Sequence, residues 1–273
     1  MSTALAQKEF VELVLEVREQ NKFIKQTSTA HELADILEIL EMRASGSHGR
    51  SPDIFAHDGT RIFHGGFQDS IDVWAMSPSA ASIKNSHIEL ANRILAGTST
   101  RVFKKFSPND LSVAVLVDAP QFSLLLGADL ENTTDAQFGW KALLRSENVP
   151  KRKSFGIKVA HHGSENGDHE GIWKDRLVLD PFAFITPYVR LNNPLPTADD
   201  VMRIKSRSQK VYCTTWPVSG RPPRRPGVDG IVQGATVQRR GMNRNTGHLR
   251  LRADLSESPI VATVERFGSA AQL

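Results

Sequence analysis

Two adjacent histidines, His161 and His162, are the residues of this chain with the clearest capacity for chemistry. They directly follow an apolar, partly β-branched run, Phe155 to Ala160, which predicts a buried strand that ends at the imidazoles. Gly163 then predicts a turn. Imidazole is the commonest metal ligand among side chains, and it titrates near neutral pH. A histidine pair on a solvated loop has the same local pattern, so the interpretation depends on what else reaches this strand end.

A second segment upstream ends in another side chain that can bind metal. Ser112 to Asp129 (SVAVLVDAPQFSLLLGAD) predicts a strand, a turn and a second strand that delivers Asp129. A carboxylate and an imidazole at consecutive strand ends suit a divalent cation such as zinc or manganese. We therefore expect Asp129 to lie close to at least one of His161 and His162, at the ends of adjacent strands.

Three segments in this order resemble a known family. They are Asn109 to Val113, Leu124 to Glu131 (LLLGADLE) and Lys158 to Ser164 (KVAHHGS). Together they resemble the second half of the metallo-β-lactamase-fold hydrolases, in particular the ComEC-like hydrolase domain of DNA-uptake proteins. The resemblance covers roughly residues 71–206, with a looser match at 247–252.

The resemblance implies an α/β fold, a layered αββα sandwich of the metallo-β-lactamase type that is incomplete on its N-terminal side. Residues 1–273 are then one domain, and the ancestral activity is metal-dependent phosphodiester hydrolysis with zinc or manganese. The implied metal ligands and catalytic residues are Asp129, His161 and His162, with the choice between the histidines left open. Residues expected to orient these ligands through hydrogen bonds are Asn109, Ser112 and Ser164.

The chain departs from the family pattern in its chief metal motif. None of the nine histidines belongs to a His-x-His-x-Asp-His sequence. Ala128 separates Gly127 from Asp129, and Leu195-Pro196-Thr197 lacks the histidine that the family has there. We therefore expect weak metal binding, or none, by this chain alone, and little or no phosphodiesterase activity of its own.

Three alternatives stay open at this point. The chain is a degenerate hydrolase, or a non-catalytic binding or assembly module that pairs its sheet edge with another chain, or half of a split enzyme. In the last case a partner chain carries the missing motif. A start of the reading frame upstream of Met1 would also account for the missing motif.

Basic side chains gather in two places that could contact a phosphodiester. Lys151, Arg152 and Lys153 precede the histidine strand and are predicted as substrate contacts, and the arginine-rich residues 219–245 are predicted to form a flexible loop. Arginine clamps phosphate bidentately, so nucleic acid is the candidate substrate or partner. Solvated charge with no partner is the alternative for both segments.

Composition agrees with a globular protein, since 40% of the 273 residues are apolar and 23% are charged. The single cysteine, Cys213, is predicted in the core, permits no intrachain disulfide and fits a reducing cytoplasm. No apolar run long enough to span a membrane is present in the sequence, and no signal-peptide pattern precedes the first helix. The net charge of +4 is too small to argue strongly for a polyanionic partner.

The remaining pattern alternates helices and strands, as an α/β protein does. Residues 1–50 predict two amphipathic helices, and 246–273 predict a closing β-hairpin. Helices are also expected at 85–95, at 134–144 and at 197–204, the last with Thr197 as its N-cap. Further strands are expected at 61–64, 72–76, 181–187 and 209–215, and the segment 165–171 with Asp168 and His169 is expected to be a solvated loop.

Overall fold

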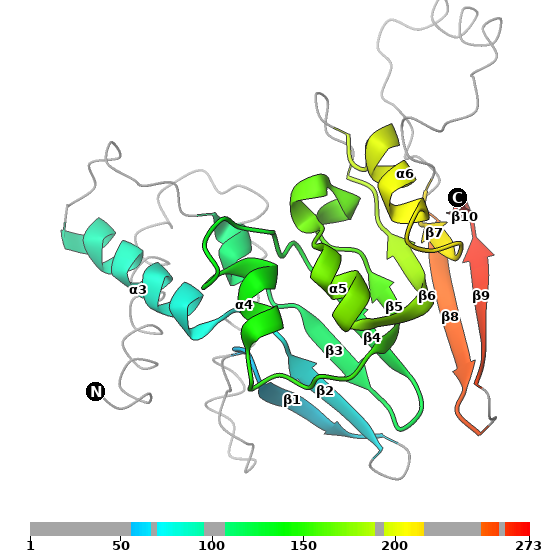
Figure 1. Ribbon diagram of the computed structural model, residues 1–273, viewed down its shortest axis with the longest axis horizontal. Coiled ribbons are helices and arrows are strands. Elements are labelled where there is room, and N and C mark those ends of the chain that lie inside the picture. Colours follow the sequence, from blue (N-terminus) through cyan, green and yellow to red (C-terminus); the bar gives the residue numbers. More distant parts are fainter. Residues whose placement is uncertain (1–55, 67–69, 96–106, 189–193, 216–246, 257–259) are drawn as a thin grey trace, which may run out of the picture. The chain divides into compact units, whose positions relative to one another are not determined.

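A computed structural model describes part of the chain, namely residues 56–66, 70–95, 107–188, 194–215, 247–256 and 260–273 (Figure 1). The chain divides into two units, 1–54 and 55–273, and all the described residues belong to the second. The helices predicted within 1–50 and the basic loop predicted at 219–245 therefore fall outside the described residues. The prediction that 1–273 is a single domain remains a prediction.

A mixed sheet of eight strands forms the centre of the described unit, in the order β1-β2-β3-β4-β5-β6-β7-β10. The first four strands pair antiparallel, β4 to β7 pair in parallel, and β10 returns antiparallel to β7. The strands are β1 (Thr60–Gly65), β2 (Ile71–Ala75), β3 (Val115–Asp118), β4 (Ser123–Leu126), β5 (Ser154–Lys158), β6 (Leu177–Ile185), β7 (Val211–Cys213) and β10 (Ala271–Gln272). A separate antiparallel hairpin consists of β8 (His248–Asp254) and β9 (Val261–Phe267).

Helices cover one face of the parallel half of the sheet. The helices are α3 (Ala80–Leu95), α4 (Gly139–Arg145), α5 (Glu170–Asp175) and α6 (Ala198–Lys205). Short 3-10 turns precede β3 at Pro108–Leu111 and follow β5 at His161–Gly163 and Glu165–Gly167. Figure 1 shows α4, α5 and α6 in front of the strands. Trp140 of α4, Ile172 of α5 and Ile204 of α6 are buried in one cluster with Ile157 of β5. Each such buried aliphatic side chain contributes about 1.5–3 kcal/mol relative to exposure.

The structure confirms the α/β class, while the metallo-β-lactamase sandwich remains a prediction. The predicted strands at 112–129, 155–160 and 181–187 correspond to β3, β4, β5 and β6. Thr197 caps α6 as predicted, in a reciprocal capping box with Asp200. Cys213 is fully buried, as predicted. The predicted hairpin near the carboxyl end is also present, although its last residues leave it to form β10.

One helix boundary and one loop prediction were wrong for local reasons. The helix predicted from residue 134 begins only at Gly139, because the Thr133 hydroxyl binds the Asp135 carbonyl and the Asp135 carboxylate binds the Gln137 amide, which favours a turn. The segment 165–171 is not a solvated loop, because α5 begins at Glu170. Among the described helices, none is long and apolar enough to cross a membrane.

Candidate functional site

The carboxyl ends of β4 and β5 lie side by side because the two strands pair in parallel. The turn after β4 contains Asp129, and the turn after β5 contains the two histidines. Two backbone hydrogen bonds join these turns, from Gly127 N to Lys158 O and from His161 N to Ala128 O, both 2.9 Å long. The parallel pairing therefore brings the carboxylate and the imidazoles to one edge of the sheet.

His162 and Asp129 are in direct contact range. Nε2 of His162 lies 3.7 Å from Oδ1 of Asp129, which confirms the predicted proximity. Nδ1 of His162 lies 2.8 Å from the carbonyl oxygen of Thr186, at the end of β6. Because a carbonyl oxygen can only accept, Nδ1 carries the proton of the neutral ring, and Nε2 keeps its lone pair toward Asp129. The ring also stacks on Tyr188, with centroids 5.0 Å apart.

The backbone of both turns adopts a conformation that side chains disfavour. The φ angles of Ala128, His161 and His162 are 47°, 44° and 57°, in the left-handed region. A non-glycine residue in this region destabilises the folded state by on the order of 1–3 kcal/mol, and it persists only where the surrounding structure holds it. The energetic cost is thus concentrated at the edge where Asp129 and the histidines meet.

Glu131 is the residue of this site that the sequence interpretation missed. One of its oxygens, Oε1, accepts hydrogen bonds from Nδ2 of Asn109 (2.8 Å) and Nδ2 of Asn166 (3.1 Å). The same oxygen lies 3.0 Å from Nδ1 of His161. That nitrogen is buried and makes no well-aligned hydrogen bond, so Glu131 is its near neighbour and not its hydrogen-bond partner. The available signal was its place two residues after Asp129 in the same turn.

The three residues expected to orient the ligands do so to different degrees. Asn109 binds Glu131 directly, and the Ser164 hydroxyl donates to Oδ1 of Asn166, which in turn binds Glu131. Both therefore act on His161 through Glu131. The described contacts of Ser112 are made by its backbone, whose carbonyl accepts from the Ser77 hydroxyl (2.6 Å). Ser112 therefore holds the loop before β3.

Lys158, the last residue of β5, brings a partly buried amine to the same region. Burial lowers the pKa of Lys158, and the negative charge of Asp129 acts in the opposite direction. Its Nζ donates to the carbonyl oxygen of Val159 (3.1 Å). Asp129 therefore has a cation as well as His162 in its surroundings.

The basic cluster Lys151-Arg152-Lys153 lies at the other end of β5. It precedes the strand, whereas the histidines follow it. Lys151 pairs with Glu147, Arg152 with Asp118 (2.6 Å), and Lys153 Nζ binds the carbonyl oxygen of Lys174. A ligand that contacts both this cluster and the histidines would have to span the length of β5. The cluster is therefore not part of the candidate site.

Asp168 and His169 have structural partners. The Asp168 side chain is only 8% exposed and pairs with Arg203, with Nε and Oδ2 2.9 Å apart. The His169 ring accepts a hydrogen bond from the Gly171 amide and caps α5. Burial, followed by the charge of Lys141, lowers the pKa of His169, which keeps the ring neutral in this role.

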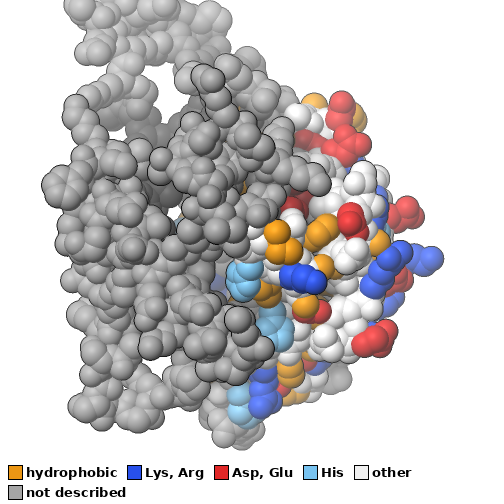
Figure 2. Space-filling view, turned by 90° about the vertical axis from the view of Figure 1, so that its left-hand side faces the viewer, with side chains coloured by type: hydrophobic (Ala, Val, Ile, Leu, Met, Phe, Trp, Pro, Cys, Tyr) orange, Lys and Arg blue, Asp and Glu red, His pale blue; other side chains and the backbone are white. Residues whose placement is uncertain are grey.

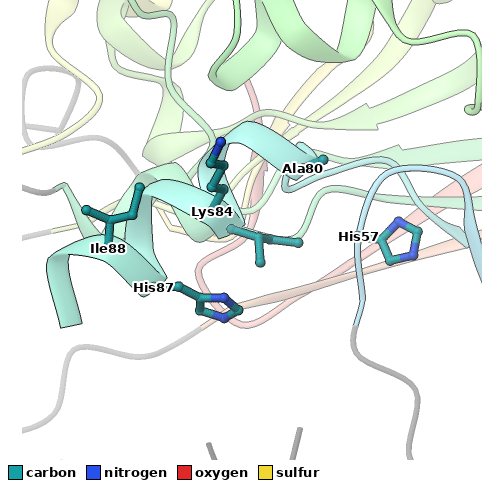
Figure 3. A pocket seen from close by; sticks show the side chains of 6 residues that line it. His57, Ala80, Lys84, His87 and Ile88 are labelled. Carbon is teal, nitrogen blue, oxygen red and sulfur yellow. The ribbon is translucent and has the colours of Figure 1, made fainter. Parts of the chain in front are cut away.

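Other described histidines have neighbours outside the candidate site. Figure 2 shows one face of the molecule on which histidine side chains lie near those of lysine or arginine. An open hollow beside α3 is lined by His57, Ala80, Ile83, Lys84, His87 and Ile88 (Figure 3). His64 of β1 pairs across the strands with Asp72 of β2 (2.8 Å). Neither the hollow nor this pair includes a residue of the candidate site.

Within the described ranges, no group of three or more His, Cys, Asp and Glu side chains is placed to hold a metal ion. The candidate site thus offers a pair of donors, Asp129 and His162, with His161 and Glu131 beside them. Comparisons of the chain with protein-family models, curated proteins and solved structures find no match.

Proposed function

We propose that this chain is a degenerate hydrolase of the metallo-β-lactamase class that weakly binds one divalent cation, zinc or manganese, through Asp129 and His162. A single observation carries the proposal. Nε2 of His162 faces Oδ1 of Asp129 at 3.7 Å while Nδ1 is held by a backbone carbonyl. An imidazole that donates its other N–H to a carbonyl oxygen is the usual arrangement of a metal-binding histidine.

The donor atoms fit a shared ion. Zinc lies about 2.0–2.2 Å from an imidazole nitrogen or a carboxylate oxygen. Two such atoms 3.7 Å apart can therefore contact the same ion with little movement. The Asp129 side chain is 47% exposed and that of His162 is 25% exposed, so an ion can reach both.

The surrounding residues have roles that follow from their contacts. The Thr186 carbonyl holds His162 in the tautomer that presents a lone pair, and the stacked Tyr188 ring limits its rotation. His161, held beside Glu131, is the second imidazole at this edge and is assigned to substrate contact. A bound divalent ion would polarise a phosphoryl oxygen and lower the pKa of a coordinated water.

The proposed substrate class is a phosphodiester, including nucleic acid, and the chain by itself is proposed to be inactive. Catalytic zinc usually has three protein ligands and one water, whereas this site offers two donors. A partner chain that carries a His-x-His-x-Asp-His motif would complete it. A cytoplasmic location also belongs to the proposal.

Metal binding to the purified chain is the decisive experiment. Calorimetric titration with zinc should show binding that weakens more than about tenfold in Asp129→Asn and in His162→Gln. The matched control is His64→Gln, which removes an imidazole from another His–Asp pair of the same sheet. Equal zinc affinity in all four proteins, or no binding by the wild type, would contradict the proposed metal site.

Activity assays separate a half-site from a complete one. A phosphodiesterase assay with zinc or manganese should give no turnover above background for the chain alone. Turnover that Asp129→Ala abolishes would overturn the proposed inactivity and would mean that residues left out of the site, such as His57, His64 or Asp168, supply the missing ligands.

Assembly with another chain is a second candidate function, favoured by the edge strand β1. Its only strand partner in the described part of the chain is β2. Ile62 and Phe63 of β1 are 42% and 50% exposed. An uncovered edge with apolar side chains can add a strand from another chain. Light scattering would test this by comparing the mass of the wild type with that of Phe63→Glu, with the exposed Lys84→Glu as a charge-change control outside β1.

A further inference from the structure

Arg203 of α6 joins that helix to the histidine turn. Its Nε donates to Asp168 (2.9 Å), its Nη1 to Asp200 (2.6 Å), and its Nη2 to the carbonyl oxygen of Gly163 (2.7 Å). Gly163 directly follows His162 in the chain. One side chain, fixed at all three nitrogens, therefore reaches the backbone of the candidate site.

The carboxylates that hold Arg203 are themselves fixed. The side chains of Asp168 and Asp200 are 8% and 6% exposed. The other oxygen of Asp168 accepts a hydrogen bond from the Trp173 indole of α5 (2.6 Å). The guanidinium cannot swing away without leaving the buried Asp200 carboxylate without its cation, which is unfavourable. Arg203 is thus a rigid donor aimed at Gly163.

The histidine turn needs such support because three consecutive residues have positive φ. The angles are 44° at His161, 57° at His162 and 86° at Gly163. Helix α6 also packs under the turn, since a Cβ added to Gly163 would meet Cδ1 of Ile204 at 3.1 Å. Helix α6 therefore contributes both a hydrogen bond and a packing contact to the turn that directs His162.

We propose that Arg203 is a positioning residue of the candidate site. By binding the Gly163 carbonyl, it keeps His162 in the conformation that places Nδ1 on Thr186 and Nε2 toward Asp129. The expected effect of Arg203 on metal affinity rests on the proposed function. Its expected effect on the orientation of the His162 ring is independent of the proposed function.

Arg207 provides a matched comparison in the same network. Its Nη2 lies 3.7 Å from the same oxygen of Asp168, and its guanidinium lies over the Trp173 ring. Among the described residues it makes no hydrogen bond to the histidine turn. If a substitution acts only by disturbing the packing of this network, Arg203 and Arg207 variants should show the same effect on His162. If Arg203 positions the histidine turn, only the Arg203 variant should change the state of His162.

The test compares Arg203→Lys with Arg207→Lys by nitrogen NMR of the metal-free protein at a pH where imidazole is neutral. Ring nitrogen shifts report the fraction of His162 in the Nδ1–H tautomer. We expect this fraction to fall in Arg203→Lys and to stay at the wild-type value in Arg207→Lys. Zinc affinity should fall about 10- to 100-fold in the first variant only.

The outcomes separate the inference from the proposed function. An unchanged His162 tautomer in folded Arg203→Lys, or the same change in Arg207→Lys, overturns the positioning role. A wild type that binds no zinc overturns the metal site, yet a tautomer change confined to Arg203→Lys still supports the positioning role. If Arg203→Lys does not fold, Asp168→Asn keeps the guanidinium but weakens its anchoring, and the same tautomer comparison then decides.

Discussion

Nδ1 of His161 lies 3.0 Å from Oε1 of Glu131, the oxygen that also accepts hydrogen bonds from Asn109 and Asn166. One carboxylate oxygen thus joins the turn before β3, the turn after β4 and the segment after β5. These segments are far apart in sequence, so Glu131 determines how they meet around the candidate site.

Removal of the Glu131 carboxylate should destabilise the protein more than removal of an exposed carboxylate does. We expect Glu131→Ala to lower the free energy of unfolding by about 1–3 kcal/mol, because buried or half-buried donors lose their acceptor. Urea denaturation followed by fluorescence measures the change. Glu165→Ala, which removes an exposed carboxylate in the neighbouring turn, is the control and should change stability by less than about 0.5 kcal/mol. If both variants lose a similar amount of unfolding free energy, Glu131 does not join the three segments.

Contact between the two turns depends on the absence of a side chain at Gly127. A Cβ there would lie 2.8 Å from Cβ and 2.9 Å from N of Ala160, so Gly127→Ala must push the turns apart. We expect a loss of about 1–3 kcal/mol together with weaker zinc binding. Gly171→Ala in α5 is the control, because a Cβ there would meet only side-chain atoms, Cδ1 of Leu144 at 2.8 Å and Nδ1 of the capping His169 at 3.1 Å, and no backbone. It should cost less stability than Gly127→Ala and leave zinc binding unchanged. A Gly127→Ala protein of wild-type stability would contradict the close approach.

The Cys213 thiol should be unreactive in the native protein. Burial raises its pKa to about 11. An acid whose folded pKa lies above the unfolded value stabilises the fold below the unfolded pKa, and this contribution is lost as the pH rises from about 9 to about 11. Unfolding measured over that range should therefore show a steeper alkaline loss for the wild type than for Cys213→Ala. A thiol reagent that modifies the folded protein at pH 8 as fast as the denatured one would refute the prediction.

Acid should weaken the anchoring of α6 through Asp200. Burial acts to raise the pKa of this carboxyl group, but hydrogen bonds from Arg203 and Thr197 hold it below its ordinary value. A depressed folded pKa gives stability above the unfolded pKa of about 4, which is lost as the pH falls below it. Asp200→Asn should therefore be less stable than the wild type at pH 7, with a smaller difference at pH 3. Asp199→Asn, an exposed neighbour, should show neither effect.

Much of the sheet could be predicted because its strands have local signatures. The apolar runs that end at Asp129 and His161 correspond to β4 and β5, and Thr197 begins α6 as its capping pattern indicates. The start of α4 could not be predicted, because the hydrogen bonds of Thr133 and Asp135 outweigh the helical periodicity that follows. The burial of Asp168 was also missed, since its partner Arg203 lies 35 residues away.

By itself, the sequence determined which side chains stand at the ends of β4 and β5, because apolar runs and turn residues act over a few neighbours. Only the tertiary structure decided which atoms those side chains contact. The parallel pairing of β4 with β5, and of β5 with β6, brings Asp129 to Nε2 of His162 and the Thr186 carbonyl to Nδ1. Glu131 and Arg203 acquire their contacts only when distant segments pack together. A ring's orientation depends on partners from other elements, and no local pattern in the chain encodes those partners.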